Sequence, residues 1–578
     1  MNLAERVFKN VHLEGIIVWG VWGLMTAAGL VYLQQYGCDI PRADDWYLVT
    51  ELASGQRLTL NWLWEPVADH RLPLQKLIVW VLWNSTGGSI KEGLFLGFIP
   101  LALTVAALIV AAHRIRGKIS FFDAFFPLYL LHLGHAPIFL WWTTIGVPWN
   151  VALTCLIMAA LIFERWHSSW SHFALIQIGI VLLILNGSTG FLYSIPLLLA
   201  LLTSFALWYR RLALRHLVLL AIGVAIIVTL QALYLAGVAN LKFQEETRFS
   251  LPRFIGTFAE FLGMAVGPVV ARRTWPISGI FVFTFIAASV VALLCQKNVN
   301  AIQRISYFCL ILSPVALALG VALGRHYQGG LLDRYAMYVS PLLVCLYLLW
   351  VRFADERLSN FTAFCLFVLA CSMAGFNFSN GLAFGKTLLG NAHALSSDIR
   401  RGATPMELVA TRSRDWCNRE QVFEDGLRAL QRAKVSPFDN IPPNPPFEKI
   451  QIFEEPTVAW NCIRTGEGWQ TQGPGSSLRF LCSESYHVYV IRITFLLKSS
   501  GSSAKMRIMW IGRQDGPLHQ MVKTAETTFW FNTAKPRRVE TVSFWVDDCL
   551  QYFDFYPNTS ASEIDIKEVT LLVRQGNK

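Results

Sequence analysis

The sequence is poor in charge, since only 15% of its 578 residues are Asp, Glu, Lys or Arg while 54% are hydrophobic. Soluble globular chains carry about 25% charged residues. This composition therefore excludes an ordinary water-soluble protein and indicates a chain that resides in a bilayer. The net charge of +11 does not indicate nucleic-acid binding, because the basic residues cluster in short loops such as 113–118 and 210–211. Such clusters are typical orientation signals between membrane spans.

The sequence also lacks several signatures of soluble enzymes. It has no phosphate-binding P-loop, no dinucleotide-binding glycine fingerprint and no cysteine spacing typical of a zinc site. These absences argue against the use of a cytosolic nucleotide sugar. The first apolar run has no small-residue cleavage site and is followed directly by further runs. We therefore expect it to be a membrane anchor rather than a cleaved signal peptide.

About eleven apolar runs are long enough to cross a hydrocarbon core, which takes about 20 residues. They lie near 14–35, 93–112, 121–140, 145–163, 173–187, 190–209, 216–236, 276–295, 303–323, 335–351 and 361–377. The run at 121–140 is unusual because it contains Asp123, His132 and His135. The fold class that these runs predict is a polytopic α-helical membrane protein.

The charges of the loops predict the orientation of the spans, because Lys and Arg are in excess in cytoplasmic loops. With Arg6 and Lys9 inside, alternating spans place most of the short basic loops inside as well. The remaining loops are then expected outside, together with the C-terminal tail: 36–92, 141–147, 187–189, 237–275, 324–334 and everything after about 378. The expected location is the inner (plasma) membrane of a cell with a periplasmic or extracellular C-terminus, although a eukaryotic endomembrane with a lumenal tail would show similar polarity.

The composition changes near residue 380, where the apolar runs shorten. We expect a transmembrane domain over 1–379, a helical linker region over 380–440 and a soluble extracytoplasmic β-rich domain over 441–578. The segments 486–497, 504–511, 539–546 and 564–573 alternate apolar and polar residues, which predicts a small β-sandwich.

Four cysteines lie in this tail, namely Cys417, Cys462, Cys482 and Cys549. An oxidising outer compartment would permit disulfides among them. Four buried thiols are the alternative, and spacing alone cannot decide the pairing.

The first outer loop places two adjacent carboxylates, Asp44 and Asp45, just after the first span. Adjacent carboxylates repel each other unless a cation or a shared proton compensates. At a membrane boundary such a pair suits a general base that takes a proton from a hydroxyl group. A solvated turn is the alternative interpretation of the pair by itself.

Two basic clusters lie in loops on the same predicted side. His70 and Arg71 open an amphipathic segment that reaches about residue 82 and could meet an anionic head group. An interfacial helix held by Arg71 and Lys76 is the alternative. Arg325 and Arg334 bracket a short Gly-containing turn and could clamp a phosphate or pyrophosphate.

The order of these motifs resembles the GT-C superfamily of glycosyltransferases, which use polyprenyl-phosphate sugars. The matching elements are Asp44-Asp45-Trp46, Asp69-His70-Arg71, Gly324-Arg325 and Arg334-Tyr335, and the resemblance spans roughly 14–377. Asp69 stands where bacterial members more often have Glu. Trp141-Trp142-Thr143 stands where they have a Trp-Glu-Asn element.

The resemblance implies an inverting transferase whose donor is an undecaprenyl- or decaprenyl-phosphate sugar and whose acceptor is a glycan, lipid or protein. Asp44 would be the catalytic base, and Asp45 would orient the acceptor or bind a divalent cation, which is the one cofactor expected. Further residues would contact the donor phosphate or the substrates: His70, Arg71, Arg325 and Arg334 for the phosphate, and Asp69, His326 and Tyr335 for the substrates. From its predicted side and fold, rather than from the resemblance, we expect the tail domain to bind or position the acceptor glycan.

Three other functions remain open at this point. A polysaccharide or O-antigen polymerase or ligase also acts on lipid-linked sugars, but typically relies on a long outer loop rich in Arg and His. A transporter or flippase of lipid-linked glycans would show an internal repeat and paired broken helices, and the sequence shows neither. A structural or assembly subunit would tolerate replacement of Asp44.

Overall fold

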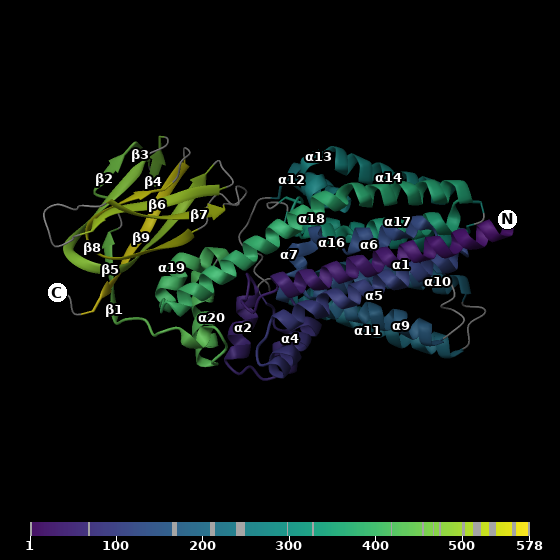
Figure 1. Cartoon of the computed structure of the whole chain (residues 1–578), viewed down its shortest axis with the longest axis horizontal. Helices are drawn as coiled ribbons and strands as arrows, with labels where there is room; N and C mark the ends of the chain where they lie inside the picture. The colour runs from purple at the N-terminus through teal and green to yellow at the C-terminus, as the bar shows by residue number, and fades with distance from the viewer. Residues whose placement is uncertain are drawn as a thin grey trace. The chain divides into compact units, whose positions relative to one another are not determined.

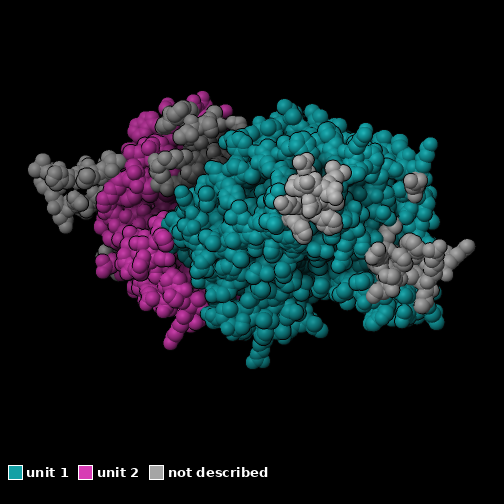
Figure 2. Space-filling model, turned by 45° about the vertical axis from the view of Figure 1, so that its right-hand side comes forward, with its two compact units in different colours: residues 1–48, 55–392 teal, residues 49–54, 393–578 magenta. Residues whose placement is uncertain are grey.

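The computed structural model describes residues 3–575 except 68–69, 164–169, 209–213, 239–248, 298, 326–328, 418, 454–455, 466–467, 473–475, 500–502, 513–521, 531–538 and 558–561. The chain folds into two compact units, coloured separately in Figure 2. The first unit comprises residues 1–48 and 55–392, and the second comprises residues 49–54 and 393–578.

The first unit is a bundle of long apolar helices (Figure 1). Among the described residues, nine helical stretches are long and apolar enough to cross a membrane. They are built on α1 (Leu3–Tyr36), α5 (Lys91–Arg116), α8 (Gly146–Phe163), α10 (Ser188–Trp208), α11 (Leu214–Val238), α14 (Ile277–Cys295), α15 (Ala301–Arg325), α16 (Tyr335–Val339) with α17 (Pro341–Phe353), and α18 (Glu356–Arg400). A further apolar helix, α9 (Trp170–Leu185), is shorter. These helices make the chain a polytopic helical membrane protein.

The helices expose large apolar side chains on their outer faces, such as Leu24, Ile222 and Phe361. Water would penalise such exposure, whereas lipid tails accept it, because the bilayer is as apolar as these side chains. The outer faces of the bundle therefore fit a lipid environment.

The predicted span at 121–140 is not one continuous helix. It consists of four short pieces: η1 (Phe121–Ala124), α6 (Phe125–Leu130), η2 (Leu133–His135) and α7 (Ala136–Phe139). Pro137 lies in the first turn of α7, where its missing backbone N–H is tolerated but would interrupt a helix that continued from before it. At the break, His132 Nδ1 accepts a hydrogen bond from Gly134 N at 3.0 Å, and the ring of His132 stacks on that of His135. Both histidines therefore lie buried at the helix break.

A buried ion pair links the end of α5 to η1. Arg116 Nη1 donates to both carboxylate oxygens of Asp123 at 2.9 and 2.8 Å, and Tyr347 Oη donates to Asp123 Oδ1 at 2.6 Å. Ser120 N adds a fourth hydrogen bond to this carboxylate. Nearby, Lys118 and the Glu356 carboxylate form a second ion pair in which both side chains are at least half exposed.

We expect Arg116→Met to destabilise the protein by roughly 3–5 kcal/mol, because it leaves the buried Asp123 carboxylate without its cation. The matched control is Lys118→Met, whose exposed ion pair contributes less than about 1 kcal/mol. Thermal unfolding of both variants in one detergent measures the difference. Equal unfolding temperatures would contradict a stabilising role for the Arg116–Asp123 pair.

Short helices occupy the long loops of the chain. They are α2 (Asp45–Ala53), α3 (Leu60–Trp64), α4 (Pro73–Thr86), η3 (Trp142–Thr144), α12 (Leu251–Gly263), η6 (Met264–Val266) and α13 (Pro268–Thr274). The predicted amphipathic segment after Arg71 is α4. Its Lys76 is only 1% exposed and donates to Trp62 O at 2.7 Å. Lys76 therefore links α4 to α3 through a buried hydrogen bond. The alternative in which its side chain extends to the membrane surface is wrong.

The second unit combines helices with a sheet of nine described strands. Its helical elements are α19 (Pro405–Trp416), α20 (Glu420–Arg432) and η7 (Phe438–Asn440). Its strands are β1 (Phe447–Phe453), β2 (Val458–Trp460), β3 (Cys462–Thr465), β4 (Gly468–Thr471), β5 (Ser477–Ser499), β6 (Ser503–Gly512), β7 (Val522–Trp530), β8 (Val539–Tyr556) and β9 (Ser562–Arg574). Hydrogen bonds join them in the order β3-β4-β9-β5-β8-β6-β7, with β1 on β9 and β2 on β5.

The long strand β5 bends at an irregularity between Val488 and Val490. Before it, residues such as Phe480 and Val488 face the core, and after it Ile491 and Ile493 do so. A β-bulge of this kind shifts the alternation by one residue and bends the strand. All four strands predicted from the alternating pattern are confirmed within β5, β6, β8 and β9. The sandwich itself stays a prediction, because hydrogen bonds join the described strands into one sheet.

The predicted helical linker over 380–440 is divided between the units, since 380–392 continue α18 in the first unit and 393–440 belong to the second. Met406 of α19 packs with Tyr489, Val490 and Leu572 on one face of the sheet. Its backbone N–H donates to Asn444 Oδ1 in the Pro-rich stretch at 2.9 Å. All eleven cysteines of the chain are free thiols, including the four in this tail.

Candidate functional site

The loop after α1 is hydrogen-bonded to the start of α5 through Asp39, a few residues before the adjacent carboxylates Asp44 and Asp45. Asp39 Oδ1 accepts hydrogen bonds from Ser89 Oγ, Ile90 N and Lys91 N, all within 2.9 Å. These bonds satisfy backbone donors at the start of α5, where a helix has unpaired N–H groups. Ala43 then adopts a positive φ of 47°, a backbone conformation that is costly for a residue other than glycine. The turn at Ala43 separates Arg42 from Asp44 and Asp45.

Asp45 is a buried structural carboxylate. It is 1% exposed, and its two oxygens accept the N–H groups of Arg42 at 2.9 Å and Thr143 at 2.7 Å. Burial raises the pKa of Asp45 to about 6, although these hydrogen bonds oppose the shift. On the other side of the same residue, Thr143 O accepts a hydrogen bond from Gln75 Nε2. Asp45 and Gln75 therefore both hold the backbone at Thr143, Asp45 through the N–H group and Gln75 through the carbonyl oxygen.

The raised pKa of Asp45 predicts a pH-dependent stability. The pKa is about 6 in the fold against an ordinary 3.8, so the group stabilises the fold fully below pH 3.8 and loses this contribution as the pH rises through about 6. The loss amounts to about 3 kcal/mol. Thermal unfolding between pH 4 and pH 7.5 should therefore show a steeper decline for the wild type than for Asp45→Asn, which cannot ionise. Parallel pH profiles would contradict this role.

Asp44 differs from Asp45 in that its side chain is half-buried. It interacts electrostatically with the phenol of Tyr338, on which the charges of Arg325 and Arg334 also act. Three residues predicted from two separate loops, Asp44 in one and Arg325 and Arg334 in the other, therefore lie within electrostatic range of one tyrosine. Asp44 is the carboxylate of the pair that remains accessible, since Asp45 is enclosed.

His70 links two further loops to this cluster. Arg325 Nη2 lies 3.0 Å from His70 Nε2, and His70 Nδ1 lies 3.1 Å from Ser188 Oγ. Arginine can only donate, so Nε2 is the accepting nitrogen. The neutral ring then carries its proton on Nδ1 and donates to Ser188. This arrangement holds the Arg325 guanidinium in a fixed orientation at the end of α15.

The loop that carries Arg334 is held by α12 and α13. Gly330 N donates to Glu260 Oε2 at 2.7 Å, and a Cβ atom at Gly330 would lie only 2.4 Å from Phe261 N. Glycine is therefore required for this close approach of two backbones. Arg272 and Asp333 form an ion pair at 3.0 Å. These contacts position Arg334, whose guanidinium also lies over the ring of Tyr335.

Arg42 belongs to the site although it is not among the residues predicted from the sequence. Its guanidinium lies 5.3 Å from the ring centre of Trp141 and 4.8 Å from that of Phe384. Burial lowers the pKa of Arg42, and the charge of Arg334 acts in the same direction while Asp45 opposes it. Its Nη1 is buried and has no hydrogen-bond partner among the described residues. Two close guanidinium groups, one with an unused buried donor, favour an anion between them.

The remaining predicted residues have different outcomes. Arg71 Nη1 donates to Trp64 O at 2.8 Å and its guanidinium lies over the Trp64 ring, which holds it against α3. Tyr335 is buried, with a hydroxyl that has no hydrogen-bond partner in the described part of the chain. Asp69 and His326 lie outside the described residues.

The residues present do not form an evident cation site. No group of three or more His, Cys, Asp or Glu side chains suited to a metal ion occurs among the described residues. Both oxygens of Asp45 already accept backbone N–H groups. Divalent cations bound by a protein need several oxygen ligands, so the donor set does not fit a cation held at Asp45.

Several contacts of the site could not be seen in the sequence. Thr143 and Ser188 meet their partners across 98 and 118 residues. Arg42 could have been noticed in the sequence, because it lies in the same loop as Asp44 and Asp45. Its aromatic neighbours Trp141 and Phe384 could not, because they lie far away in the sequence. No family model matches the chain, and no curated protein matches it.

Proposed function

We propose that the protein is an inverting glycosyltransferase of the GT-C type that moves a sugar from a polyprenyl-phosphate donor to a glycan, lipid or protein acceptor. The observation that carries this proposal is that the charges of Asp44, Arg325 and Arg334 all act on Tyr338, while the charge of Arg334 also acts on Arg42. An accessible carboxylate beside several guanidinium groups suits a reaction in which a hydroxyl loses a proton and a phosphate leaves.

The proposed reaction is a single displacement. The Asp44 carboxylate takes the proton of an acceptor hydroxyl while that oxygen bonds to the anomeric carbon of the donor sugar. The bond from this carbon to the phosphate oxygen breaks, and the electron pair leaves on the polyprenyl phosphate. Arg325 and Arg334 stabilise the charge that develops there. Because the attack comes from the face opposite the leaving group, the anomeric configuration inverts.

Two residues position these groups without contacting the reacting atoms. His70 accepts from Arg325 and is itself tied to Ser188, so it orients one guanidinium. Asp45 holds the turn that presents Asp44 and fixes Thr143 opposite it. Such positioning is needed because a displacement of about 1 Å of a catalytic group can lower the reaction rate about 100-fold.

The proposed topology has eleven crossings, with the site on the extracytoplasmic face of the plasma membrane. It is supported by the contacts among loops. Loops assigned outside bond to one another through Asp45–Thr143, His70–Ser188 and His70–Arg325. Loops assigned inside bond through Lys118–Glu356. In this topology the interrupted segment at 121–140 crosses the membrane, since Asp123 lies beside Arg116 and Thr143 lies beside Asp45.

The experiment that tests this proposal offers purified protein in lipid nanodiscs a panel of radiolabelled polyprenyl-phosphate sugars with candidate acceptors. The proposal expects labelled sugar on an acceptor with at least one donor. Activity only with pyrophosphate-linked oligosaccharides would instead support a polymerase or ligase. In proteoliposomes, movement of an intact lipid-linked sugar across the bilayer without bond cleavage would support a transporter.

A further inference from the structure

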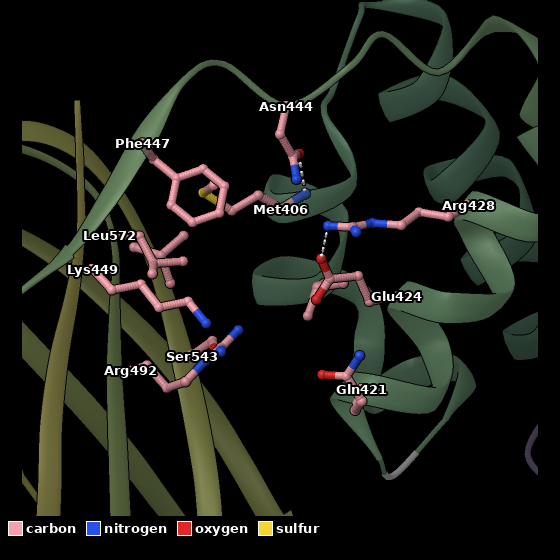
Figure 3. Close-up of a pocket in the computed structure, with 12 residues that line it drawn as sticks. Met406, Gln421, Glu424, Arg428, Asn444, Phe447, Lys449, Arg492, Ser543 and Leu572 are labelled. Carbon is pink, nitrogen blue, oxygen red and sulfur yellow. Dashed lines mark hydrogen bonds and ion pairs between the residues drawn. The ribbon is translucent and has the colours of Figure 1, made fainter. Parts of the chain in front are cut away.

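A pocket of about 200 Å³ lies inside the second unit, between helices α19 and α20 and one face of the sheet (Figure 3). A volume of this size corresponds to roughly six to seven water molecules, which is suited to a single small ring rather than to a long ligand. The residues that line it come from both sides: Met406, Val409, Gln421, Glu424 and Arg428 from the helices, Asn444 from the Pro-rich stretch, and Phe447, Lys449, Val490, Arg492, Ser543 and Leu572 from the sheet.

The sheet side of the pocket carries two cations. Lys449 is exposed, and its side chain has no hydrogen bond or ion pair with any described residue. Arg492 Nε donates to Ser543 Oγ at 3.3 Å, and this hydroxyl donates to Glu420 Oε2 at 2.6 Å. This chain of hydrogen bonds orients Arg492. In Figure 3 the ends of Lys449 and Arg492 are directed into the same space.

The helix side of the pocket neutralises Arg492 in part, because Glu420 Oε2 of α20 lies 4.0 Å from Arg492 Nε in an ion pair. The lining carboxylate, Glu424, is paired with Arg428 at 2.5 Å one turn further along α20. Arg428 and Arg492 are therefore paired with Glu424 and Glu420, and Lys449 is the lining cation that has no carboxylate partner among the described residues. Like charges that share a space are unfavourable unless an anion joins them. The positive charges of Lys449 and Arg492 therefore favour the binding of an anionic ligand in the pocket.

Two side-chain amides give the pocket a donor and an acceptor. Asn444 Oδ1 accepts the backbone N–H of Met406 at 2.9 Å, which leaves the Asn444 NH₂ group as a donor. Gln421 Nε2 donates to Asp425 Oδ1 at 3.0 Å, which leaves the Gln421 carbonyl as an acceptor. Hydroxyl groups both donate and accept, so a polyhydroxyl ligand could satisfy both amides.

The remaining wall of the pocket is apolar. Met406, Val490 and Leu572 pack together, and Phe447 packs against them. Binding sites for small molecules combine such an apolar wall with a few fixed polar groups. One face of a sugar ring can lie against this wall while its polar edge meets the amides and its charged group meets Lys449 and Arg492.

We propose that this pocket binds a sugar residue that bears a carboxylate, as in a uronic acid. That this sugar belongs to the acceptor glycan rests on the proposed glycosyltransferase function, whereas the binding itself does not. The carboxylate lies between Lys449 and Arg492, and the hydroxyl groups bond to Asn444 and Gln421.

The test titrates the full-length protein in nanodiscs with methyl glucuronide, using methyl glucoside as the uncharged counterpart, in the absence of any donor. We expect saturable binding of methyl glucuronide that is at least tenfold tighter than that of methyl glucoside. Lys449→Met should weaken it at least tenfold, since a hydrogen bond to a charged group contributes this much. Lys449 is exposed, so this variant should fold. The control Lys567→Met removes an exposed lysine of β9 that is paired with Asp565 and should bind as the wild type does.

Equal binding of the two glycosides, absence of saturable binding, or unchanged affinity in Lys449→Met would overturn the proposal. Inorganic phosphate that competes as strongly as methyl glucuronide would show a simple anion site and would overturn the sugar assignment. Because no donor is present, the result stands apart from the proposed function: a protein that transfers no sugar can still bind methyl glucuronide.

Discussion

Asp44→Asn is expected to lower sugar transfer by about 100- to 10,000-fold, which is the range that a general base contributes. Asparagine has nearly the same shape as aspartate but cannot take a proton from the acceptor hydroxyl. Because the Asp44 side chain is only half-buried, the substitution should leave the fold intact. Initial rates of transfer from the active donor, measured beside the unfolding temperature, separate a catalytic effect from a structural one.

The control for this prediction is Glu65→Gln, which removes an exposed carboxylate from the same long loop. We expect it to transfer sugar at the wild-type rate. Wild-type activity in a well-folded Asp44→Asn protein would remove Asp44 from the mechanism and would favour a structural or transport role for the chain.

Arg325→Met is expected to lower kcat/KM for the donor by about 100- to 1,000-fold, as the loss of one preorganised donor to a developing negative charge does. The physical reason is that Arg325 is held by His70 and shares the site with Arg334. Arg325→Lys keeps the charge but not the planar fork that binds phosphate with two hydrogen bonds. It should therefore retain an intermediate activity.

The matched control is Arg253→Met, which removes an exposed arginine from α12 in another outer loop. Its kcat/KM should equal that of the wild type. If Arg253→Met and Arg325→Met lost activity equally, the effect would reflect the general charge of the surface rather than a phosphate site at Arg325.

The architecture of the bundle could largely be predicted from apolar run length, because a membrane span must satisfy its backbone within one helix. The segment at 121–140 shows the limit of that rule. Its length and apolarity match a span, but Pro137 and the cap formed by His132 break it into short helices. Its backbone is buried in protein rather than exposed to lipid, and irregular backbone is tolerated at membrane depth under that condition.

The site could be predicted only in part, because residue types point to chemistry while long-range contacts assign the roles. The sequence shows two equal carboxylates at Asp44 and Asp45. The structure distinguishes them, since Asp45 is enclosed by the backbone of Arg42 and Thr143. In the same way, His70 and Arg71 look like one basic pair, but His70 contacts Arg325 whereas Arg71 packs on Trp64. Their partners lie on different helices, which no local pattern can reveal.

The most direct test of the proposed reaction counts the free polyprenyl phosphate released for each new glycosidic bond, with purified wild-type protein in nanodiscs. A single displacement predicts one molecule of polyprenyl phosphate released per bond formed, together with an inverted anomeric configuration in the product. Retention of configuration, or sugar movement without any released polyprenyl phosphate, would contradict it.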